Sequence, residues 1–313
     1  MDAVLGHLPA HVSYCRFNID EFPIHTRLDL TPTRATARIV AHTSAGAFDL
    51  THVSAVWFRR LGAATIDPAI STAAHRSFAL GEAEAAIAGL AYLLEDAAWV
   101  SPFDATRKAS AKAYQLRVAV ECGLTVPSTL ITNDPASARA FLPAHPQTLY
   151  KTLHSPSITY SDRRALIFSH VVQPEDLPLF DRIRYTPCQF QEYVPKAYEL
   201  RITWTGEAFH SIQIDSQATA DGRVDWRAAG MTQLRYAHAP LPAEVEHGLR
   251  RLVQRLDLHY GAIDMIVTPE GRYVFLEINP HGAWLWLEHE VGLPIAASIA
   301  NYLTSRVASR ART

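Results

Sequence analysis

Short runs of apolar residues, bounded by polar or turn-forming residues, recur along most of the chain and predict both strands and helices. Two early runs read as strands, at 12–19 (VSYCRFNI) and 53–58 (VSAVWF), and an Ala-rich stretch from Gly81 to Ala98 reads as a long helix. A stripe at helical spacing predicts an amphipathic helix over Ala243–Leu256. Five later runs read as strands, at 188–194, 200–206, 208–214, 261–267 and 272–278. This mixture is typical of an α/β to α+β protein and argues against a solenoid or a helix bundle.

Turn-forming residues divide this pattern into three parts. The chain opens with MDAVLGHL, which reads as a helix, and a first boundary is expected near Val100–Ser101. After it come a loop, a helix that stops at Gly123, and a strand that follows Pro127. A third part begins near Pro187. We therefore expect an N-terminal domain at 1–100, a central subdomain at 101–186 and a C-terminal subdomain at 187–313.

The composition is that of a folded protein with several subdomains. Of the 313 residues, 48% are hydrophobic, which is enough for a buried core, and 19% are charged, which argues against global disorder. This length is near the upper limit for one hydrophobic core, so two or three subdomains are expected. The net charge is −2 with Lys and Arg scattered, so we expect no nucleic-acid partner.

Targeting and redox signals favour the cytoplasm. The first residues lack the basic stretch and apolar run of a signal peptide. The Ala-rich stretch contains four acidic side chains, so it reads as a helix in water and no membrane partner is expected. Cys15, Cys122 and Cys188 form neither a CxxC pair nor a disulfide framework, which suits a reducing compartment. The 15 histidines form no HExxH motif, so a histidine-based metal site is not expected.

One predicted hairpin, GAIDMIVTPEGRYVFLEINP, carries polar side chains that a buried strand does not need. Its strands flank a turn that begins at Thr268, where Pro269 and Gly271 favour a type I turn. If Thr268 pairs with Gly271, then Asp264 faces Phe275, and side chains alternate from that pair. The inference depends on this register, because a slip of one residue exchanges the two faces.

In this register, Asp264, Glu277 and Asn279 project from one face, and the apolar side chains Ile263, Val274, Leu276 and Ile278 lie on the other. Two carboxylates and an amide oxygen at one point suit Mg²⁺ that holds a nucleotide phosphate, because Mg²⁺ takes one or two carboxylates and completes its shell with phosphate and water. Acidic residues are also common on the solvent-facing side of an antiparallel sheet. The hairpin by itself favours neither interpretation.

Other features of the chain shift this balance. A strand is expected to end at Val194, at an edge or a hinge, because Pro195 cannot donate to a ladder. Free backbone groups from Glu192 to Val194 would suit the edge of an adenine. Lys112, on a predicted helix, and Lys151, at the end of a predicted strand, are single cations without acidic neighbours in sequence. Each feature alone also fits an ordinary edge strand or a surface lysine, but together with the oxygen ligands they indicate a nucleotide site.

This ordered set resembles the ATP-grasp superfamily, and more narrowly the ATP-grasp ribosomal peptide maturases, the microviridin-type (graspetide) ligases. The resemblance runs from about Val12 over most of the chain. It rests on VSAVWFRRLG, KAYQLRVAVECGLTVPSTLITND, CQFQEYVPKAYELRITWTG, VDWR at 224–227, GAIDMIVTPEGRYVFLEINPHGAWLWLE and GLPIAASIANYL. It implies an ATP-grasp fold with an N-terminal pre-ATP-grasp domain, a central domain and a C-terminal antiparallel-sheet domain.

The resemblance also implies a role for individual residues. Lys112 and Lys151 are expected at the nucleotide phosphates, and Arg201 at the γ-phosphate. Arg227 is expected at the acceptor carboxylate or the acyl phosphate. The adenine and the ribose are assigned to Gln191, Glu192, Tyr193, Val194 and Glu199. The Mg²⁺ ligands are assigned to Asp264, Glu277 and Asn279.

The implied activity is an ADP-forming ligation on a precursor peptide made of a leader and a core. A peptide Asp or Glu side chain is activated as an acyl phosphate and condensed with a Thr or Ser hydroxyl or a Lys amine, which closes a ring. ATP and Mg²⁺ are the implied cofactors. Two alternatives stay open: an ATP-grasp ligase for amino acids or a protein tail, and a non-catalytic, nucleotide-responsive module that binds peptides.

Three further expectations concern partners. A leader with a basic residue is expected to dock on 206–227, where Asp215 and Asp221 lie near the connection of two predicted strands. A solvated turn rich in Asp and Gly would show the same pattern. Arg59 and Arg60 end a predicted strand and are candidates for a substrate or interface role, and the family implies a homodimer.

Overall fold

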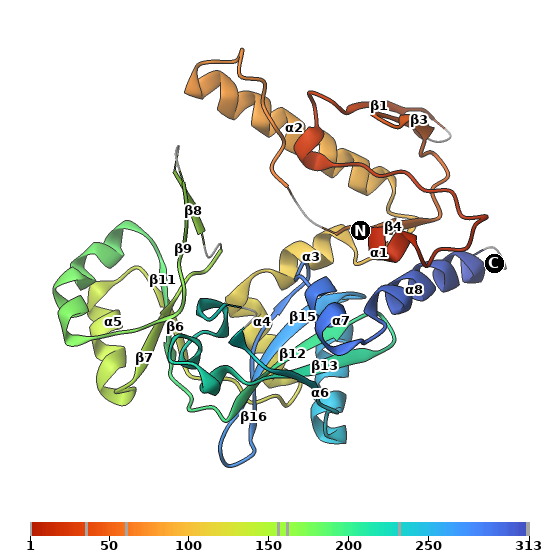
Figure 1. Cartoon of the computed structure of the whole chain (residues 1–313). Coiled ribbons are helices and arrows are strands. Elements are labelled where there is room, and N and C mark those ends of the chain that lie inside the picture. The colour runs from red at the N-terminus through yellow and green to blue at the C-terminus, as the bar shows by residue number, and fades with distance from the viewer. Residues whose placement is uncertain are drawn as a thin grey trace.

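The structure is a computed structural model of the chain, and it describes residues 2–34, 37–59, 62–154, 157–160, 163–230 and 233–310. Figure 1 shows a first part, a central lobe and a last part built on the largest sheet. Strands and helices are mixed in all three, which confirms the predicted α/β to α+β class. None of the helices in the described ranges is long and apolar enough to cross a membrane.

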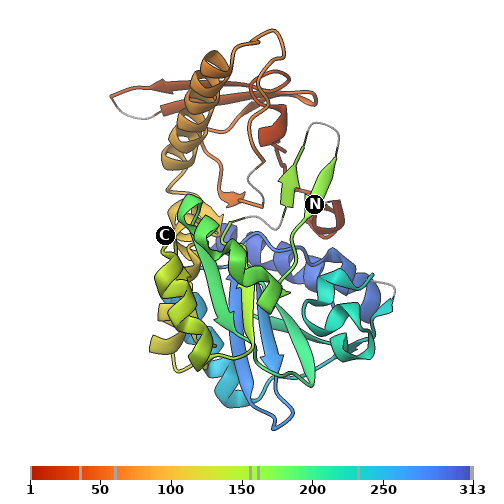
Figure 2. The ribbon, with the colours of Figure 1, turned by 90° about the vertical axis from the view of Figure 1, so that its left-hand side faces the viewer.

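The first part combines a three-stranded antiparallel sheet, a long helix and a two-stranded parallel sheet. Its elements are α1 (Asp2–Leu5), η1 (Ile19–Glu21), β1 (Arg27–Pro32), β2 (Ala37–Thr43), β3 (Gly46–Asp49), β4 (Ala55–Trp57), α2 (Ala73–Leu93) and β5 (Ala98–Val100). Figure 2 shows α2 lying across β1–β3, and Leu90 of this helix packs in one core with Ile39 and Ala41 of β2. The strand expected at 53–58 is confirmed as β4, which pairs with β5.

The strand expected at 12–19 is wrong. Residues 12–18 are irregular and lead into η1, while Cys15 and Phe17 pack against the core under β2. Their apolar alternation resembles a strand, but a strand also needs a neighbour to receive its backbone hydrogen bonds. This segment partly buries Cys15 and Phe17 without such a neighbour.

The helix expected over Gly81–Ala98 is confirmed in kind but wrong in its bounds. It starts at Ala73, where the side chain of Thr72 caps it by accepting a hydrogen bond from the N–H of His75. Its first residues are exposed on every side, so they carry no apolar stripe that could mark them.

The central lobe holds a four-stranded sheet of order β10-β7-β11-β6. The chain reaches it through α3 (Phe103–Ala109) and α4 (Lys112–Glu121). The other elements are β6 (Thr129–Thr132), α5 (Pro135–Phe141), η2 (Leu142–Ala144), β7 (Thr148–Lys151), the hairpin β8 (Ser157–Thr159) and β9 (Arg164–Leu166), β10 (His170–Val171), η3 (Pro174–Tyr185) and β11 (Cys188–Glu192). β11, which the sequence groups with the last part, pairs with β7 and β6 in this sheet. The domain limits stay predictions.

The last part is a five-stranded antiparallel sheet of order β14-β13-β12-β15-β16. Its elements are β12 (Tyr198–Trp204), β13 (Phe209–Ile214), η4 (Ser216–Ala218), η5 (Asp221–Arg223), η6 (Trp226–Ala228), β14 (Tyr236–His238), α6 (Ala243–Arg255), β15 (Gly261–Val267), β16 (Tyr273–Asn279), α7 (Leu285–Val291) and α8 (Ile295–Arg310). One core joins Leu116 of α4 and Leu249 of α6 to Ile263 of β15. The two helices therefore cover one face of the sheet. On the other face α7 and α8 pack against Ile212 of β13, and the site occupies the part around Asp264.

Candidate functional site

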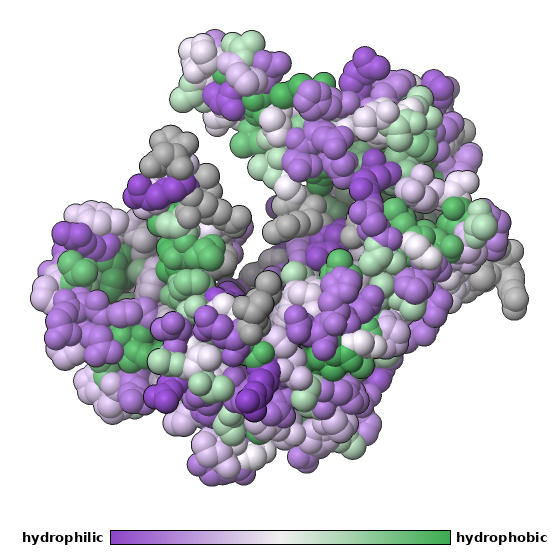
Figure 3. Space-filling view, in the orientation of Figure 1, coloured by the Kyte–Doolittle hydropathy of each residue, from purple (hydrophilic) through white to green (hydrophobic). Residues whose placement is uncertain are grey.

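A cleft of about 600 Å³ lies between the sheet of the central lobe and the five-stranded sheet. Figure 3 shows a hollow between the central lobe and the rest of the molecule. The cleft is lined by all but one of the residues that were assigned to the nucleotide, the metal or the acceptor: Lys112, Lys151, Gln191, Glu192, Tyr193, Val194, Glu199, Arg227, Asp264, Glu277 and Asn279. The exception, Arg201, is buried next to the cleft wall.

The predicted register of the β15–β16 hairpin is wrong. Met265 pairs with Phe275, and the next pair is Asp264 with Glu277, so Leu276 is an extra residue that forms a β-bulge. Phe275, which was expected opposite Asp264, is fully buried in the core. Leu276, which was expected on the core side, lines the cleft.

The bulge decides which face carries the carboxylates. In a regular ladder continued from the turn, Leu276 would face Asp264, and Glu277 would point into the core. The extra residue shifts the ladder by one position, so Glu277 pairs with Asp264 and Asn279 follows on the same side. The three side chains share a face as expected, but through a different register.

Two cations already neutralise the two carboxylates. Nζ of Lys112, the first residue of α4, lies 2.9 Å from Oε2 of Glu277. Nη1 of Arg201 donates to both carboxylate oxygens of Asp264, each at 2.9 Å. Burial alone would raise the pKa of Glu277, but the charges of Lys112 and Lys151 outweigh it and hold this pKa at about 2. Glu277 is therefore an anion throughout the physiological pH range.

Lys151 lies on the opposite wall of the cleft. Its Nζ donates to Oε1 of Gln191 at 3.0 Å, and Nε2 of Gln191 donates to Oγ1 of Thr129 at 2.9 Å. Burial lowers the pKa of Lys151, while the charge of Glu277 acts in the opposite direction. The lysine is thus positioned from neighbouring strands but lacks a tight carboxylate partner among the described residues.

The segment expected to hold adenine follows an interior strand, so the edge, one of the two predicted alternatives, is wrong, and the strand ends at Glu192 rather than Val194. β11 lies between β7 and β6, and Pro195 comes after its end, where no ladder bond is lost. The N–H of Glu192 donates to the Ser128 carbonyl at 2.9 Å. The N–H of Tyr193 donates to a carbonyl of the central lobe at the same distance. Of the backbone N–H groups from Glu192 to Val194, only that of Val194 is without a hydrogen bond to a described residue.

Glu199, expected at the ribose, is held by a lysine that sequence reasoning missed. Nζ of Lys196 lies 2.6 Å from Oε1 of Glu199, and it also donates to the Val224 carbonyl at 3.0 Å. Burial raises the pKa of Glu199, and the charge of Lys196 opposes this shift. The spacing of Lys196, three residues before Glu199, was the signal in the sequence that could have revealed this pair. The contact joins β12 to the segment that carries Arg227.

Arg227 is held by Asp225, which lies two residues before it in the VDWR motif. Nε and Nη2 of Arg227 donate to the two carboxylate oxygens of Asp225 at 2.8 and 2.6 Å. The backbone N–H and the hydroxyl of Ser169 donate to the same carboxylate at 3.0 and 3.1 Å. Burial would raise the pKa of Asp225, but the hydrogen bond and charge of Arg227 outweigh it and hold this pKa far below its usual range.

Aromatic packing also holds the segment that carries Arg227. The ring of Trp226 lies 5.3 Å from that of Trp286 on α7. Trp284 is almost fully buried in the core with α8. Trp284 and Trp286 are therefore packing residues.

The turn after β16 is tied to the first part of the chain. Oδ1 of Asn279 accepts a hydrogen bond from the N–H of His281 at 2.8 Å. Nη1 of Arg59 donates to the His281 carbonyl at 2.8 Å, and Nδ1 of His281 lies 3.2 Å from the Arg59 carbonyl. Arg59 thus touches the ligand-bearing turn, whereas Arg60 lies outside the described residues.

The two residues expected to dock a leader lie elsewhere. Asp215 and Asp221 do not line the cleft. The segment 206–227 supplies one strand, β13, followed by the short helices η4 to η6, so the second predicted strand is wrong. Asp and Gly favour such turns, which explains the interrupted pattern.

The donor set of the cleft fits a hard divalent cation. In the described ranges no group of three or more His, Cys, Asp and Glu side chains forms a metal site. What the cleft offers is two carboxylates and one amide, and the oxygen of Asn279 keeps a lone pair beside its contact with His281. Mg²⁺ needs only one or two carboxylates when phosphate oxygens complete its shell. The residues therefore fit Mg²⁺ together with a polyphosphate.

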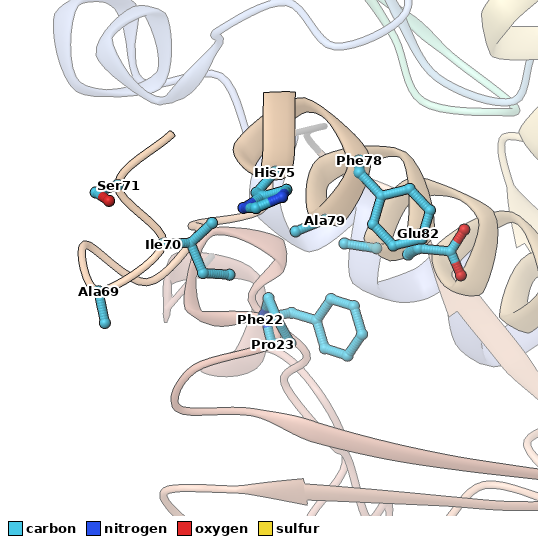
Figure 4. Close-up of a pocket in the computed structure, with 10 residues that line it drawn as sticks. Phe22, Pro23, Ala69, Ile70, Ser71, His75, Phe78, Ala79 and Glu82 are labelled. Carbon is cyan, nitrogen blue, oxygen red and sulfur yellow. The ribbon is translucent and has the colours of Figure 1, made fainter. Parts of the chain in front are cut away.

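A second cavity, of about 720 Å³, lies in the first part of the chain, between α2 and Phe22 (Figure 4). Its lining is mostly apolar, and its ionisable side chains are His75 and Glu82. A phosphate needs several cations or N–H donors, so this cavity does not compete with the cleft as a nucleotide site.

Comparisons with known proteins agree with this geometry. The family model described as the MvdD pre-ATP grasp domain matches residues 4–107. No curated protein sequence matches the chain. Among solved structures, the macrocyclase MdnC of Microcystis aeruginosa MRC, bound with the precursor peptide MdnA, is 31% identical with a TM-score of 0.84, and the match covers 97% of this chain and 94% of that one.

Two further solved structures are similar over the same length. A RiPP-associated ATP-grasp ligase of Chryseobacterium gregarium, in complex with ADP and a leader and core peptide, is 29% identical with a TM-score of 0.85, over 97% of this chain and 91% of that one. The macrocyclase MdnB of Microcystis aeruginosa MRC is 27% identical with a TM-score of 0.77, over 96% and 92%.

The sheets, the cleft and these matches define an ATP-grasp ligase with a pre-ATP-grasp domain, an ADP-forming enzyme class. Within this class, the chain belongs to the ATP-grasp maturases of ribosomally made peptides.

Proposed function

We propose that the protein is an ATP-dependent macrocyclase that joins side chains of a ribosomally made precursor peptide. The observation that carries this proposal is the single cleft in which Lys112, Lys151 and Arg227 face the side chains of Asp264 and Glu277. Membership of the maturase family supports it, since MdnC was solved with its precursor peptide.

The nucleotide would be held by both walls of the cleft. Lys112 and Lys151 would contact the phosphates, and Arg201 would meet the terminal phosphate. The hinge after β11 supports an adenine site, because the Val194 N–H points to no described acceptor. The residues that would hold the base and sugar are Gln191, Glu192, Tyr193, Val194 and Glu199.

Mg²⁺ would be held by Asp264, Glu277 and Asn279, and it supplies charge neutralisation at the phosphates when bound. ATP supplies the phosphoryl group that converts a peptide carboxylate to an acyl phosphate. A Thr or Ser hydroxyl, or a Lys amine, then displaces phosphate and forms the ester or amide. The protein contributes position and positive charge, so it needs no nucleophile of its own.

Arg227 would bind the acceptor carboxylate. Its two hydrogen bonds to Asp225 fix the plane of the guanidinium, while 41% of the side chain stays exposed at the cleft. A guanidinium fixed in this way presents a defined pair of donors to a second carboxylate.

Two proposals concern partners. Asp215 and Asp221 would bind a basic residue of the leader, and unchanged peptide affinity after Asp215→Ala and Asp221→Ala would remove this idea. A homodimer is proposed on the family resemblance alone, and sedimentation of the purified protein tests it.

The test of the proposed function is the exact mass of the short peptide encoded beside the gene, after incubation with the protein, ATP and Mg²⁺. We expect the loss of one water mass for each ring, with one ADP released for each. Fragmentation then locates the linked side chains and separates ester from amide.

The other outcomes separate the alternatives. An unchanged peptide with ADP release would point to a free amino acid or a protein tail as the acceptor. An unchanged peptide without ADP release would leave a peptide-binding module.

A further inference from the structure

The end of β16 that carries Glu277 and Asn279 is an edge of the five-stranded sheet. In the described part of the chain no strand pairs with its outward backbone groups, and an edge that must hold ligands in place needs another partner. Near the turn, the N–H of Phe275 donates to the Thr125 carbonyl at 2.8 Å. Beyond the bulge, the partner is a single side chain, that of Gln115 on α4.

The amide of Gln115 replaces a missing strand at Ile278. Its Oε1 accepts from the N–H of Ile278 at 2.7 Å, and its Nε2 lies 3.4 Å from the Ile278 carbonyl. The same Nε2 donates to the Ala109 carbonyl at 3.1 Å, which fixes the amide orientation. Gln115 is only 2% exposed, so water cannot replace these bonds.

Ile278 lies between two of the proposed metal ligands, and its own side chain points into the core. Gln115 lies three residues after Lys112, which bonds the Glu277 carboxylate. One face of α4 therefore holds this segment at two points. The Lys112 ammonium bonds the Glu277 carboxylate, and the Gln115 amide bonds the backbone of Ile278.

We propose that Gln115 is a positioning residue for the metal site, which sets the spacing of the Glu277 and Asn279 oxygens through the backbone of Ile278. This inference rests on the proposed function, since it takes those two side chains as ligands. Without the amide, the segment beyond the bulge is free to move by a few tenths of an ångström, and the divalent ion loses affinity while the fold remains.

The test measures metal binding directly, with Mn²⁺ as the probe for Mg²⁺ and ADP present at saturation. Free Mn²⁺ is followed by its electron paramagnetic resonance signal in titrations of the full-length protein. Gln115→Met keeps the volume of the side chain but removes both bonds to Ile278. We expect it to weaken Mn²⁺ binding by roughly 10- to 100-fold, the usual effect of removing a group that orients a metal ligand.

Val118→Ala on the same helix is the matched control. Val118 is 1% exposed in the core and is neither a proposed ligand nor a hydrogen-bond partner of Ile278, so its truncation lowers stability while the bonds of Gln115 to Ile278 remain. The Mn²⁺ affinity of this variant should equal that of the wild type. Excess Mg²⁺ should also restore the rate of ADP release in Gln115→Met, which a loss of folded protein would prevent.

Equal Mn²⁺ affinity in Gln115→Met and the wild type would overturn the inference, and so would an equal loss in Gln115→Met and Val118→Ala. If Gln115→Met does not fold, Gln115→Asn, which is too short to reach both groups of Ile278, is judged by the same criteria. A wild type that binds no Mn²⁺ in the presence of ADP would refute the proposed metal site itself, and this result is distinct from the other two.

Discussion

Glu277 is the side chain on which most charges of the cleft converge. Its carboxylate touches Lys112, and the charges of Lys151 and Arg227 also lower its pKa. A carboxylate in this position organises the cations and offers oxygen to a metal. The residue lies at the cleft surface, with 28% of its side chain exposed, so its removal does not leave a large cavity in a core.

Glu277→Ala should therefore abolish turnover while the fold survives. We expect ADP release to fall by about 100- to 1,000-fold or more, the cost of losing one stabilising contact in a charged site. Glu246→Ala is the control, because Glu246 also pairs with a cation, Arg250, but on α6 outside the cleft. Turnover that survives in Glu277→Ala would refute the metal assignment.

Asp225 should make a pH-dependent contribution to stability. Its pKa is depressed in the folded state, so the contribution is complete above the unfolded pKa of about 3.9 and is lost as the pH falls through the folded value. Asp225→Asn should lower the free energy of unfolding by about 2 kcal/mol at pH 7, and the difference should shrink below about pH 4.

Urea unfolding between pH 7 and pH 2 measures this effect. Asp181→Asn is the control, since Asp181 forms an exposed pair with Arg139 whose loss should cost about 0.5 kcal/mol or less. The assignment fails if both variants lose the same stability with the same pH dependence.

Single residues with strong chemistry were predictable from the sequence, but their contacts were not. Asp264 and Glu277 stand out because carboxylates within apolar strands need a reason, whereas Lys112 gained meaning only in combination with them. The bond between Ser169 and Asp225 spans 56 residues, and only the fold brings the two together. Pairs of this kind carry no local spacing that could reveal them.

At the scale of elements, the turn after β16 lies very close to the sheet at Gly282. A Cβ on Gly282 would lie 2.3 Å from Cβ of Ala262 on β15 and 2.8 Å from Nη2 of Arg201 on β12. The Gly282 carbonyl also accepts from the hydroxyl of Tyr260 at 2.5 Å. The turn is thus pressed against the sheet where Arg201 reaches Asp264.

Gly282→Ala should push this turn away from the sheet. We expect a loss of about 1–3 kcal/mol in the free energy of unfolding, the usual cost of overpacking, together with slower ADP release. Gly81→Ala on α2 is the matched control, because nothing lies within 4 Å of its added Cβ and helix propensity should raise stability by about 0.5–1 kcal/mol. Equal unfolding midpoints for the two variants in urea would contradict the close approach.

Elements were predictable where an apolar pattern was complete. α6 was expected at 243–256 and is found at Ala243–Arg255, because one face packs on the sheet along its whole length. The bulge at Leu276 was not predictable, since alternation of side chains assumes a regular ladder. β1 to β3 were not predicted either, although β1 alternates between exposed and half-buried residues over its first four positions.

In the whole molecule, Arg59 is a direct link between the first part of the chain and the turn after β16. It bonds His281 across 222 positions of sequence, and its guanidinium lies 5.7 Å from the ring centre of Tyr260. The first part is therefore held against the end of β16 by a side chain at the end of β4.

Arg59→Ala should loosen that turn without unfolding either part. We expect faster hydrogen exchange in peptides that cover 279–284, by roughly 10-fold, which corresponds to about 1.4 kcal/mol of local opening. Arg76→Ala is the control, since Arg76 also donates to backbone carbonyls but only within 66–70 of the first part. Unchanged exchange at 279–284 in Arg59→Ala would show that other contacts hold the turn.

The arrangement of the three parts was predictable only through the family resemblance. Strand patterns indicated an α/β to α+β class, but they did not place β11 in the central sheet. Such pairings depend on loop paths and on contacts far apart in the chain, which local patterns do not encode.

The two ion pairs of the cleft have a consequence for how ligands can bind there. Arg201 on Asp264 and Lys112 on Glu277 act as built-in counter-ions. If the proposed metal and polyphosphate enter together, the carboxylates would pass from the cations to the metal, and the cations would pass from the carboxylates to the phosphates. Filling the site would then be an exchange of partners in which no charge is left unpaired, and the reverse exchange would let the products leave after each round.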